Sequence, residues 1–248
     1  MYIFSIAITR HIHLARYGRL GKTKLAQTIP LRFNPPNLAM PERGAEKSTQ
    51  RHNQPWTREE HILAFNLYCK IPFGTIHTGN PQVIELARLL GRTSSSIALK
   101  LTNFARLDPA LQSRGVGGMK HGAKGEEEVW QEFAAHPEAL AFESEELLAQ
   151  RLGKPIEEVA DLSRDDIPRE GVEREAIVRL RVNQKFFRDR ILSAYNFRCC
   201  VTGLTVRPLL TASHIIPWSE DKKNRLNPKN GLCLMGGCGL GSMSVGFW

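Results

Sequence analysis

The segment Leu209-Leu-Thr-Ala-Ser-His-Ile-Ile-Pro217 carries the pattern that decides the fold of the carboxyl-terminal part of the chain. Its apolar and β-branched residues predict a strand that ends at Pro217 and holds His214 near its end. Before it, Phe197-Arg-Cys-Cys-Val-Thr-Gly203 predicts a short strand that ends in a turn. After it, Asn227-Pro-Lys-Asn-Gly-Leu-Cys-Leu234 predicts the start of a helix, with a capping residue and an early proline. Two strands and a helix in this order can hold a histidine beside a bound cation.

His214 is a candidate catalytic residue because hydrolysis of a phosphodiester requires a base that takes a proton from water. It also requires a cation that offsets the charge on the phosphate and the leaving oxygen. Histidine titrates near neutral pH and can act as that base, which typically contributes about 10²–10⁴ in rate. A hard divalent ion such as Mg²⁺ would supply the electrostatic part. The competing interpretation is a hydrogen-bonded core histidine, the commoner fate of a single histidine on an apolar strand.

Three short motifs follow one another here: Cys200-Val-Thr-Gly-Leu204, Ala212-Ser-His-Ile-Ile-Pro-Trp218 and Asn224-Arg-Leu-Asn-Pro-Lys-Asn-Gly-Leu-Cys-Leu234. Their order and spacing resemble the HNH endonucleases, in a bacterial branch often linked to restriction. The resemblance covers residues 175–234. It implies an α+β chain with a carboxyl-terminal ββα-metal domain, and a metal-dependent endonuclease that hydrolyses DNA.

The resemblance also implies roles for single residues. His214 matches the family's general base, and Asn230 matches its middle asparagine, which shapes the loop or approaches the metal. Ser213 stands where many members have a metal-binding acid. Cys238 falls, by spacing, where the family has a metal-binding histidine.

The tail that starts at Met235 departs from the family and allows three interpretations. Cys238 could be a substitute ligand, although a lone thiolate suits a hard metal poorly. The tail could be a divergent end, or it could result from a frameshift or truncation. The third interpretation is favoured because glycines break the helix that should continue there. It predicts a truncated relative with impaired activity.

Capping signals predict a three-helix unit over residues 54–115, after a poorly ordered leader over residues 1–53. The signals are a capping box at Thr57 and Glu60, a cap followed by proline at Asn80-Pro81, and a cap at Thr93 or Ser94.

This unit has the pattern of a helix-turn-helix and is similar to Myb-type domains and to the domain that often precedes HNH nucleases. Arg92 and Lys100 are then candidate DNA contacts near the third helix. The alternative is a packing module that makes no contact with DNA.

Residues 116–172 are acidic and helix-prone, and we expect a linker with helical pieces that acts as a solvated spacer. Residues 173–248 are the expected nuclease domain, with the last element missing after about residue 234. Its first helix carries basic residues that could bind phosphate or could form the wet face of an amphipathic helix. The candidates are Arg179, Arg181, Lys185 and Arg188.

The chain is basic, with 34 Lys and Arg against 25 Asp and Glu, a net charge of +9 and a pI near 9.5. This surplus favours a polyanionic partner, with DNA as the first choice. A second hypothesis is therefore a non-catalytic DNA-binding protein that uses the helical unit and the basic helix.

Five cysteines do not form an even disulfide framework, which predicts reduced thiols in a cytoplasm. Four of them could bind a structural Zn²⁺, but this is less favoured because no CxxC pair occurs. No stretch has the length of a transmembrane helix, so a membrane is not an expected partner. The oligomeric state cannot be read from the sequence.

Overall fold

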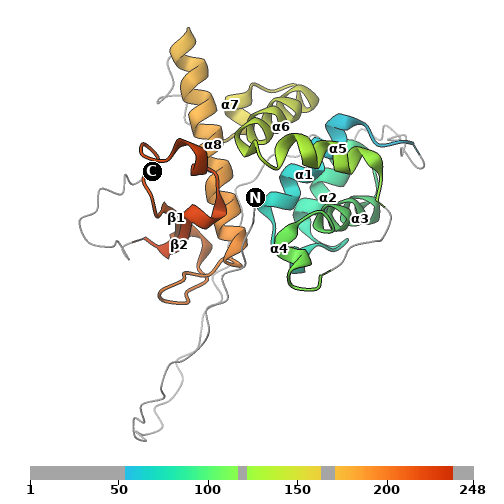
Figure 1. Cartoon of the computed structure of the whole chain (residues 1–248). Coiled ribbons are helices and arrows are strands. Elements are labelled where there is room, and N and C mark those ends of the chain that lie inside the picture. Colours follow the sequence, from blue (N-terminus) through green and yellow to red (C-terminus); the bar gives the residue numbers. More distant parts are fainter. Residues whose placement is uncertain (1–53, 117–121, 163–170, 237–248) are drawn as a thin grey trace, which may run out of the picture. The chain divides into compact units, whose positions relative to one another are not determined.

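The computed structural model describes residues 54–116, 122–162 and 171–236 (Figure 1). Within these ranges the chain is mostly helical and contains a two-stranded antiparallel sheet, which is an α+β architecture as predicted. The leader predicted over residues 1–53 lies outside the described residues. In the described part, no helix is both long enough and apolar enough to cross a membrane.

The predicted capping signals start the helices of the first part. Thr57 and Glu60 form the capping box that begins α1, and the side chain of Asn80 caps α2. Thr93 caps α3. Gly91 ends α2 with a φ of 64°, in the left-handed region that favours glycine. The helices are α1 (Arg58–Lys70), α2 (Pro81–Leu90), α3 (Ser94–Ala105) and the short α4 (Pro109–Gln112).

The solvated spacer predicted over residues 116–172 is wrong for the part that is described. The segment forms α5 (Lys124–Phe133), α6 (Pro137–Leu152) and α7 (Ile156–Val159), and both α5 and α6 pack against α1. Val129 and Phe133 lie four residues apart on one face of α5, and both are buried. Most of the acidic residues of α5 lie on its exposed face. The acidic composition of the segment therefore did not indicate that α5 is an amphipathic helix with a buried face.

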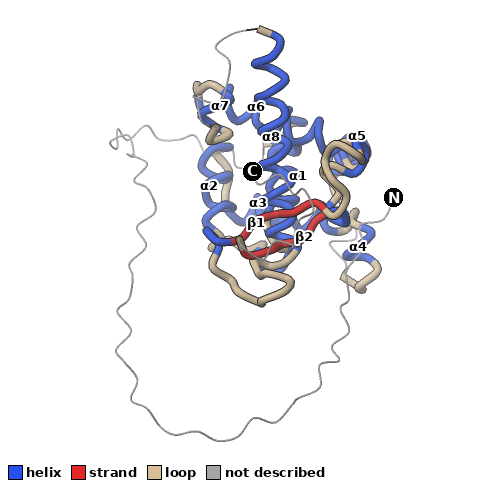
Figure 2. Tube along the Cα trace, turned by 90° about the vertical axis from the view of Figure 1, so that its left-hand side faces the viewer, coloured by secondary structure: helices blue, strands red, loops and turns tan. Residues whose placement is uncertain are grey.

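The carboxyl-terminal part is built around α8 (Val172–Ala194), a helix of 23 residues. This helix contacts α1 and α6, and it also contacts strands β1 (Leu210–His214) and β2 (Gly231–Met235). The strands lie side by side (Figure 2). They pair antiparallel, with His214 opposite Gly231. The predicted strand that carries His214 is therefore confirmed.

Two other predicted elements in this part are wrong. Residues 197–203 form a turn and not a strand. The backbone N–H of Gly203 donates to the carbonyl oxygen of Cys199 at 2.9 Å, and Phe197 at the start has a positive φ of 54°. Residues 227–234 do not begin a helix: after the short 3₁₀ turn η5 (Pro228–Asn230) the chain enters β2. Pairing decides this, because β1 without β2 would leave its backbone groups unpaired.

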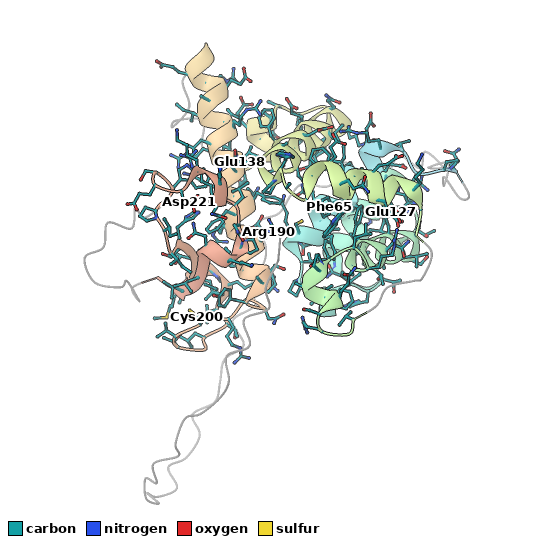
Figure 3. The ribbon with its side chains drawn as sticks, viewed as in Figure 1. Phe65, Glu127, Glu138, Arg190, Cys200 and Asp221 are labelled. Carbon is teal, nitrogen blue, oxygen red and sulfur yellow. The ribbon has the colours of Figure 1, made fainter. Side chains whose placement is uncertain are left out.

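Polar side chains of α8 hold the hairpin by its backbone carbonyl groups. Arg188 donates a hydrogen bond to the carbonyl oxygen of Leu210 at 2.8 Å, at the start of β1. Arg190, labelled in Figure 3, donates to the carbonyl oxygen of Leu226 at 3.1 Å, in the loop between the strands. These bonds attach the start of β1 and the loop between the strands to one helix.

Candidate active site

His214 is the last residue of β1, and its ring lies against two aromatic side chains. The ring of Phe187, on α8, is stacked on the imidazole with 3.8 Å between the centroids and 10° between the planes. Trp218 meets the imidazole edge-on, at 5.4 Å and 88°. The two aromatic rings therefore define the plane in which the imidazole lies.

A backbone carbonyl group selects the tautomer of His214. The Nε2 atom lies 2.8 Å from the carbonyl oxygen of Arg225, and a carbonyl oxygen only accepts hydrogen bonds. Nε2 therefore carries the proton, and the lone pair is on Nδ1, which makes no hydrogen bond to any of the described residues. Burial lowers the pKa of His214, against the opposing effect of the carbonyl group. Burial therefore favours the neutral imidazole, which is the form that a base must have.

Asn230 closes the loop that joins β1 to β2. Its Oδ1 accepts a hydrogen bond from the backbone N–H of Ile216 at 2.7 Å, and its Nδ2 donates to the carbonyl oxygen of Ile216 at 3.1 Å. Nδ2 also lies 3.3 Å from the carbonyl oxygen of Asn224. Because the amide is engaged by backbone groups on both sides, the loop-shaping role is favoured over a role at a metal.

The same loop is held internally by polar side chains. Asp221 accepts hydrogen bonds from the backbone N–H groups of Lys223 and Asn224, both at 3.2 Å. The Nε atom of Arg225 donates to the carbonyl oxygen of Trp218 at 2.8 Å. Asp221 lies on this loop, whereas Cys200 lies on the loop that precedes β1 (Figure 3). The carbonyl of Arg225 is thus presented to His214 by an ordered segment.

A glycine in β2, Gly231, allows the hairpin to pack closely against α8. Gly231 lies opposite His214, and a Cβ atom at this position would lie 2.8 Å from Cζ of Phe187 and closer still to Cδ1 of Ile191. The φ of Gly231 is −137°, so the requirement for glycine is one of space and not of backbone conformation. Glycine here brings β2 close enough for Phe187 to reach His214.

The segment with this geometry matches a known family. Residues 199–238 match the family model described as HNH endonuclease. This segment belongs to the HNH endonuclease family. Comparison with the curated proteins and with the solved structures gives no match.

The described part of the HNH segment does not bring three His, Cys, Asp or Glu side chains together. In residues 54–116, 122–162 and 171–236 no group of three His, Cys, Asp or Glu side chains could bind a metal ion. The Oγ atom of Ser213, a predicted ligand, makes a long contact of 3.5 Å with the carbonyl oxygen of His214. Ser213 also occupies the strand face opposite to His214, since successive strand residues alternate. Cys238, the other predicted ligand, lies outside the described residues.

Two predicted DNA contacts outside the HNH segment are buried in ion pairs. Arg92, with a side chain 4% exposed, lies 2.7 Å from Glu60, and Lys100 pairs with the fully buried Glu126. Both cations also flank the ring of Trp56, at 4.5 and 4.8 Å from its centroid. Their charges are balanced by carboxylates inside the helical part, so these two side chains are already engaged and are not available to contact DNA phosphate in this conformation. The helix-turn-helix function of this part stays a prediction.

Two of the four predicted basic contacts on α8 bind the protein's own backbone. Lys185 donates to the carbonyl oxygen of Ala160 at 3.0 Å, and Arg188 donates to that of Leu210. Both cations therefore have a structural role. Lys185 attaches the segment after α7 to α8, and Arg188 attaches the start of β1 to α8.

The other two basic residues, Arg179 and Arg181, lie in the amino-terminal half of α8. Arg179 is placed over the ring of Phe142, with 3.8 Å from its guanidinium carbon to the centroid, and lies 3.4 Å from Glu175. Arg181 donates to Gln184 at 3.2 Å. The side chain of Arg179 is 49% exposed, so a phosphate contact from this part of the helix stays a prediction.

The turn before β1 is organised by a cysteine to which sequence reasoning assigned no separate role. The Sγ atom of Cys199 accepts hydrogen bonds from the backbone N–H groups of Thr202 at 3.4 Å and Met235 at 3.3 Å. The hydrogen bonds from Thr202 lower the pKa of the Cys199 thiol to about 6, whereas burial raises the pKa of Cys233 to about 11. Cys199 therefore links the turn to the end of β2 through hydrogen bonds.

Two partners of His214 were not identified from the sequence. Phe187 is 27 positions before His214 along the chain. The spacing of apolar residues in its helix indicates that Phe187 is buried, but it does not indicate which side chain Phe187 contacts. The contribution of Arg225 is a backbone carbonyl group, which no residue type encodes. Trp218 and Gly231 lie within the motifs that resemble HNH endonucleases. The sequence therefore marked both positions, although it did not indicate a role for either residue.

Proposed function

We propose that the chain is an endonuclease of the HNH type that hydrolyses phosphodiester bonds in DNA, with His214 as the general base. One observation carries the proposal: the hydrogen bond from Nε2 of His214 to the carbonyl oxygen of Arg225 leaves the lone pair on Nδ1. The family match over residues 199–238 and the net charge of +9 support a nucleic-acid substrate.

The chemical step assigned to His214 is proton abstraction. Nδ1 takes a proton from a water molecule as the water oxygen forms a bond to phosphorus. The bond from phosphorus to the leaving ester oxygen breaks, and that oxygen takes up a proton from solvent. The imidazolium keeps its Nε2 hydrogen bond to Arg225, so the ring need not turn during the transfer. Asn230 supports this step indirectly by closing the loop that contains the carbonyl group.

HNH nucleases generally use a divalent metal ion, which, when bound, offsets the charge on the phosphate and on the leaving oxygen. The described residues contain no group of three His, Cys, Asp or Glu side chains that could hold such an ion. The proposal includes two levels of activity for this chain: that of a full nuclease, or that of a relative with impaired activity.

The test is nicking of supercoiled plasmid DNA by the purified chain with Mg²⁺ or Mn²⁺. We expect cleavage that EDTA stops and that His214→Ala reduces by about 10²–10⁴, the usual contribution of a general base. His77→Ala is the matched control, because His77 is an exposed histidine far along the chain from the site. Equal cleavage by wild type and His214→Ala would contradict the role of His214.

The second hypothesis, a non-catalytic DNA-binding protein, is an outcome of the same experiment. It requires binding without cleavage, measured by a gel shift under the nicking conditions at low salt. The burial of Arg92 and Lys100 in ion pairs weakens this hypothesis, because two of its expected contacts are already engaged. Binding that survives while nicking is absent would favour it.

A further inference from the structure

We infer that Phe187 is a positioning residue for His214: its stacked ring holds the imidazole in the plane in which Nε2 reaches the carbonyl oxygen of Arg225. This inference deepens the proposed function, and its kinetic part rests on that function. No part of the HNH match includes Phe187, which lies on α8 before residue 199.

The stacking constrains a torsion that is otherwise soft. The terminal torsion of a histidine side chain has a broad energy profile, so the ring plane is set by its neighbours. With 3.8 Å between the centroids and 10° between the planes, rotation of the imidazole would drive its edge into Phe187. The edge-on contact with Trp218 limits movement of the ring from a second direction. A flat aromatic face can impose this plane, and an aliphatic side chain cannot.

Phe187 is itself held firmly enough to serve as this reference surface. Phe187 is 2% exposed, and it lies on a helix that is bonded to the start of β1 and to the loop between the strands. The neighbouring Gly231 admits its Cζ atom into a space that a Cβ atom would fill. The position of the imidazole is therefore set by α8 as well as by the hairpin.

The tautomer of His214 provides a readout that does not depend on cleavage. In the full chain with ¹⁵N-labelled histidine, above the histidine pKa values, we expect the wild type to show His214 with the proton on Nε2. Phe187→Leu should give a mixture of the two tautomers and faster solvent exchange of the Nε2 proton, because the ring is free to turn away from Arg225.

Phe186→Leu is a matched control. Phe186 is the preceding residue of the same helix, is 1% exposed, and lies under the ammonium group of Lys70 at 5.7 Å. The two variants remove the same atoms from equally buried positions, but Phe186 has no ring contact with His214 among the described residues. Phe186→Leu should lower stability and leave the His214 tautomer unchanged. Phe187→Met serves as a second variant, since a flexible Met side chain fills the volume without a flat face.

Kinetics give the second readout. We expect Phe187→Leu to reduce kcat for plasmid nicking on the order of tenfold, part of the roughly 10²–10⁴ from a general base, with KM unchanged. If both Phe187 variants keep the wild-type tautomer, or if Phe186→Leu disturbs it equally, the inference is overturned. If the wild type does not nick DNA, the proposed function fails, while the tautomer measurement still decides the role of Phe187.

Discussion

Lys100 of α3 and Glu126 of α5 form a buried ion pair that joins the first helices to the segment after them. The carboxylate of Glu126 also accepts hydrogen bonds from the side chain of Asn103 at 3.0 Å and from the backbone N–H of Ala123 at 3.1 Å. Glu126 therefore caps the start of α5 while it binds α3. This pair explains why α5 packs as part of the helical assembly and not as a spacer.

Removing one partner of this pair should destabilise the fold strongly. Lys100→Met leaves the buried carboxylate of Glu126 with Arg106, at 3.8 Å, as its remaining cationic partner. Breaking a buried ion pair typically costs about 3–5 kcal/mol, and Arg106 should keep the loss near the lower end of this range. Urea unfolding of the full chain measures the change in unfolding free energy. The double variant Lys100→Met/Glu126→Leu should recover part of the loss, because no unpaired charge remains. If Lys100 instead contacts DNA phosphate, Lys100→Met would flatten the salt dependence of DNA binding and leave stability unchanged.

Asn230 should affect both stability and cleavage through the loop that it closes. Asn230→Ala leaves the backbone N–H and carbonyl of Ile216 without their partners, with a typical cost of about 1–3 kcal/mol. Asn230→Asp keeps the acceptor for the N–H group but places a carboxylate near two carbonyl oxygens, so it should not restore the wild-type value. Thermal unfolding and plasmid nicking, measured on both variants, check this. Unchanged stability in Asn230→Ala would contradict the loop-closing role.

The pH dependence of nicking should reflect the burial of His214. Burial disfavours the imidazolium, so the pKa of His214 lies below the ordinary histidine value of about 6.5. Since the neutral form is the base, kcat/KM should rise as pH increases through this lowered pKa and then level off. Trp218→Ala exposes the ring and should move the rise to higher pH, whereas Trp218→Phe should move it less. A rise in the wild type that is centred above pH 6.5 would refute this explanation.

A side chain at position 231 should destabilise the fold unless the side chains of α8 that face it move or are shortened. In Gly231→Ala the new Cβ atom overlaps with Ile191 and Phe187, and overpacking of this kind typically costs about 1–3 kcal/mol. The double variant Gly231→Ala/Ile191→Ala removes the closest obstacle and should destabilise the fold by less than the sum of the single changes. Chemical unfolding of the three variants provides the comparison. Strict additivity would mean that the two positions do not compete for space.

Local signals predicted the elements whose determinants lie within a few residues of one another. The capping box at Thr57 and Glu60, the Asn80-Pro81 cap and the cap at Thr93 all start helices where expected. The strand that carries His214 was also predicted, because β-branched residues and a terminal proline are local properties. The motifs around His214 and Asn230 were sufficient to indicate the family, which the match over residues 199–238 supports.

The errors concern elements that depend on distant partners. Residues 231–235 become a strand because β1 offers unpaired backbone groups, although the preceding cap and proline suggested a helix. The acidic segment packs because α1 presents an apolar face to Val129 and Phe133. Both outcomes depend on contacts between segments that are far apart in the sequence, and a window of neighbouring residues contains no record of them.

The sequence by itself determined that a histidine stands at the end of a strand, in motifs typical of HNH endonucleases. Tertiary structure decided what that histidine can do. The carbonyl of Arg225 places the proton on Nε2, the ring of Phe187 sets the plane, and Gly231 allows the approach. The physical reason is that a residue type specifies a pKa range and a set of donors and acceptors. The tautomer and the direction of a lone pair depend on which groups from other segments lie within about 3–4 Å of the ring.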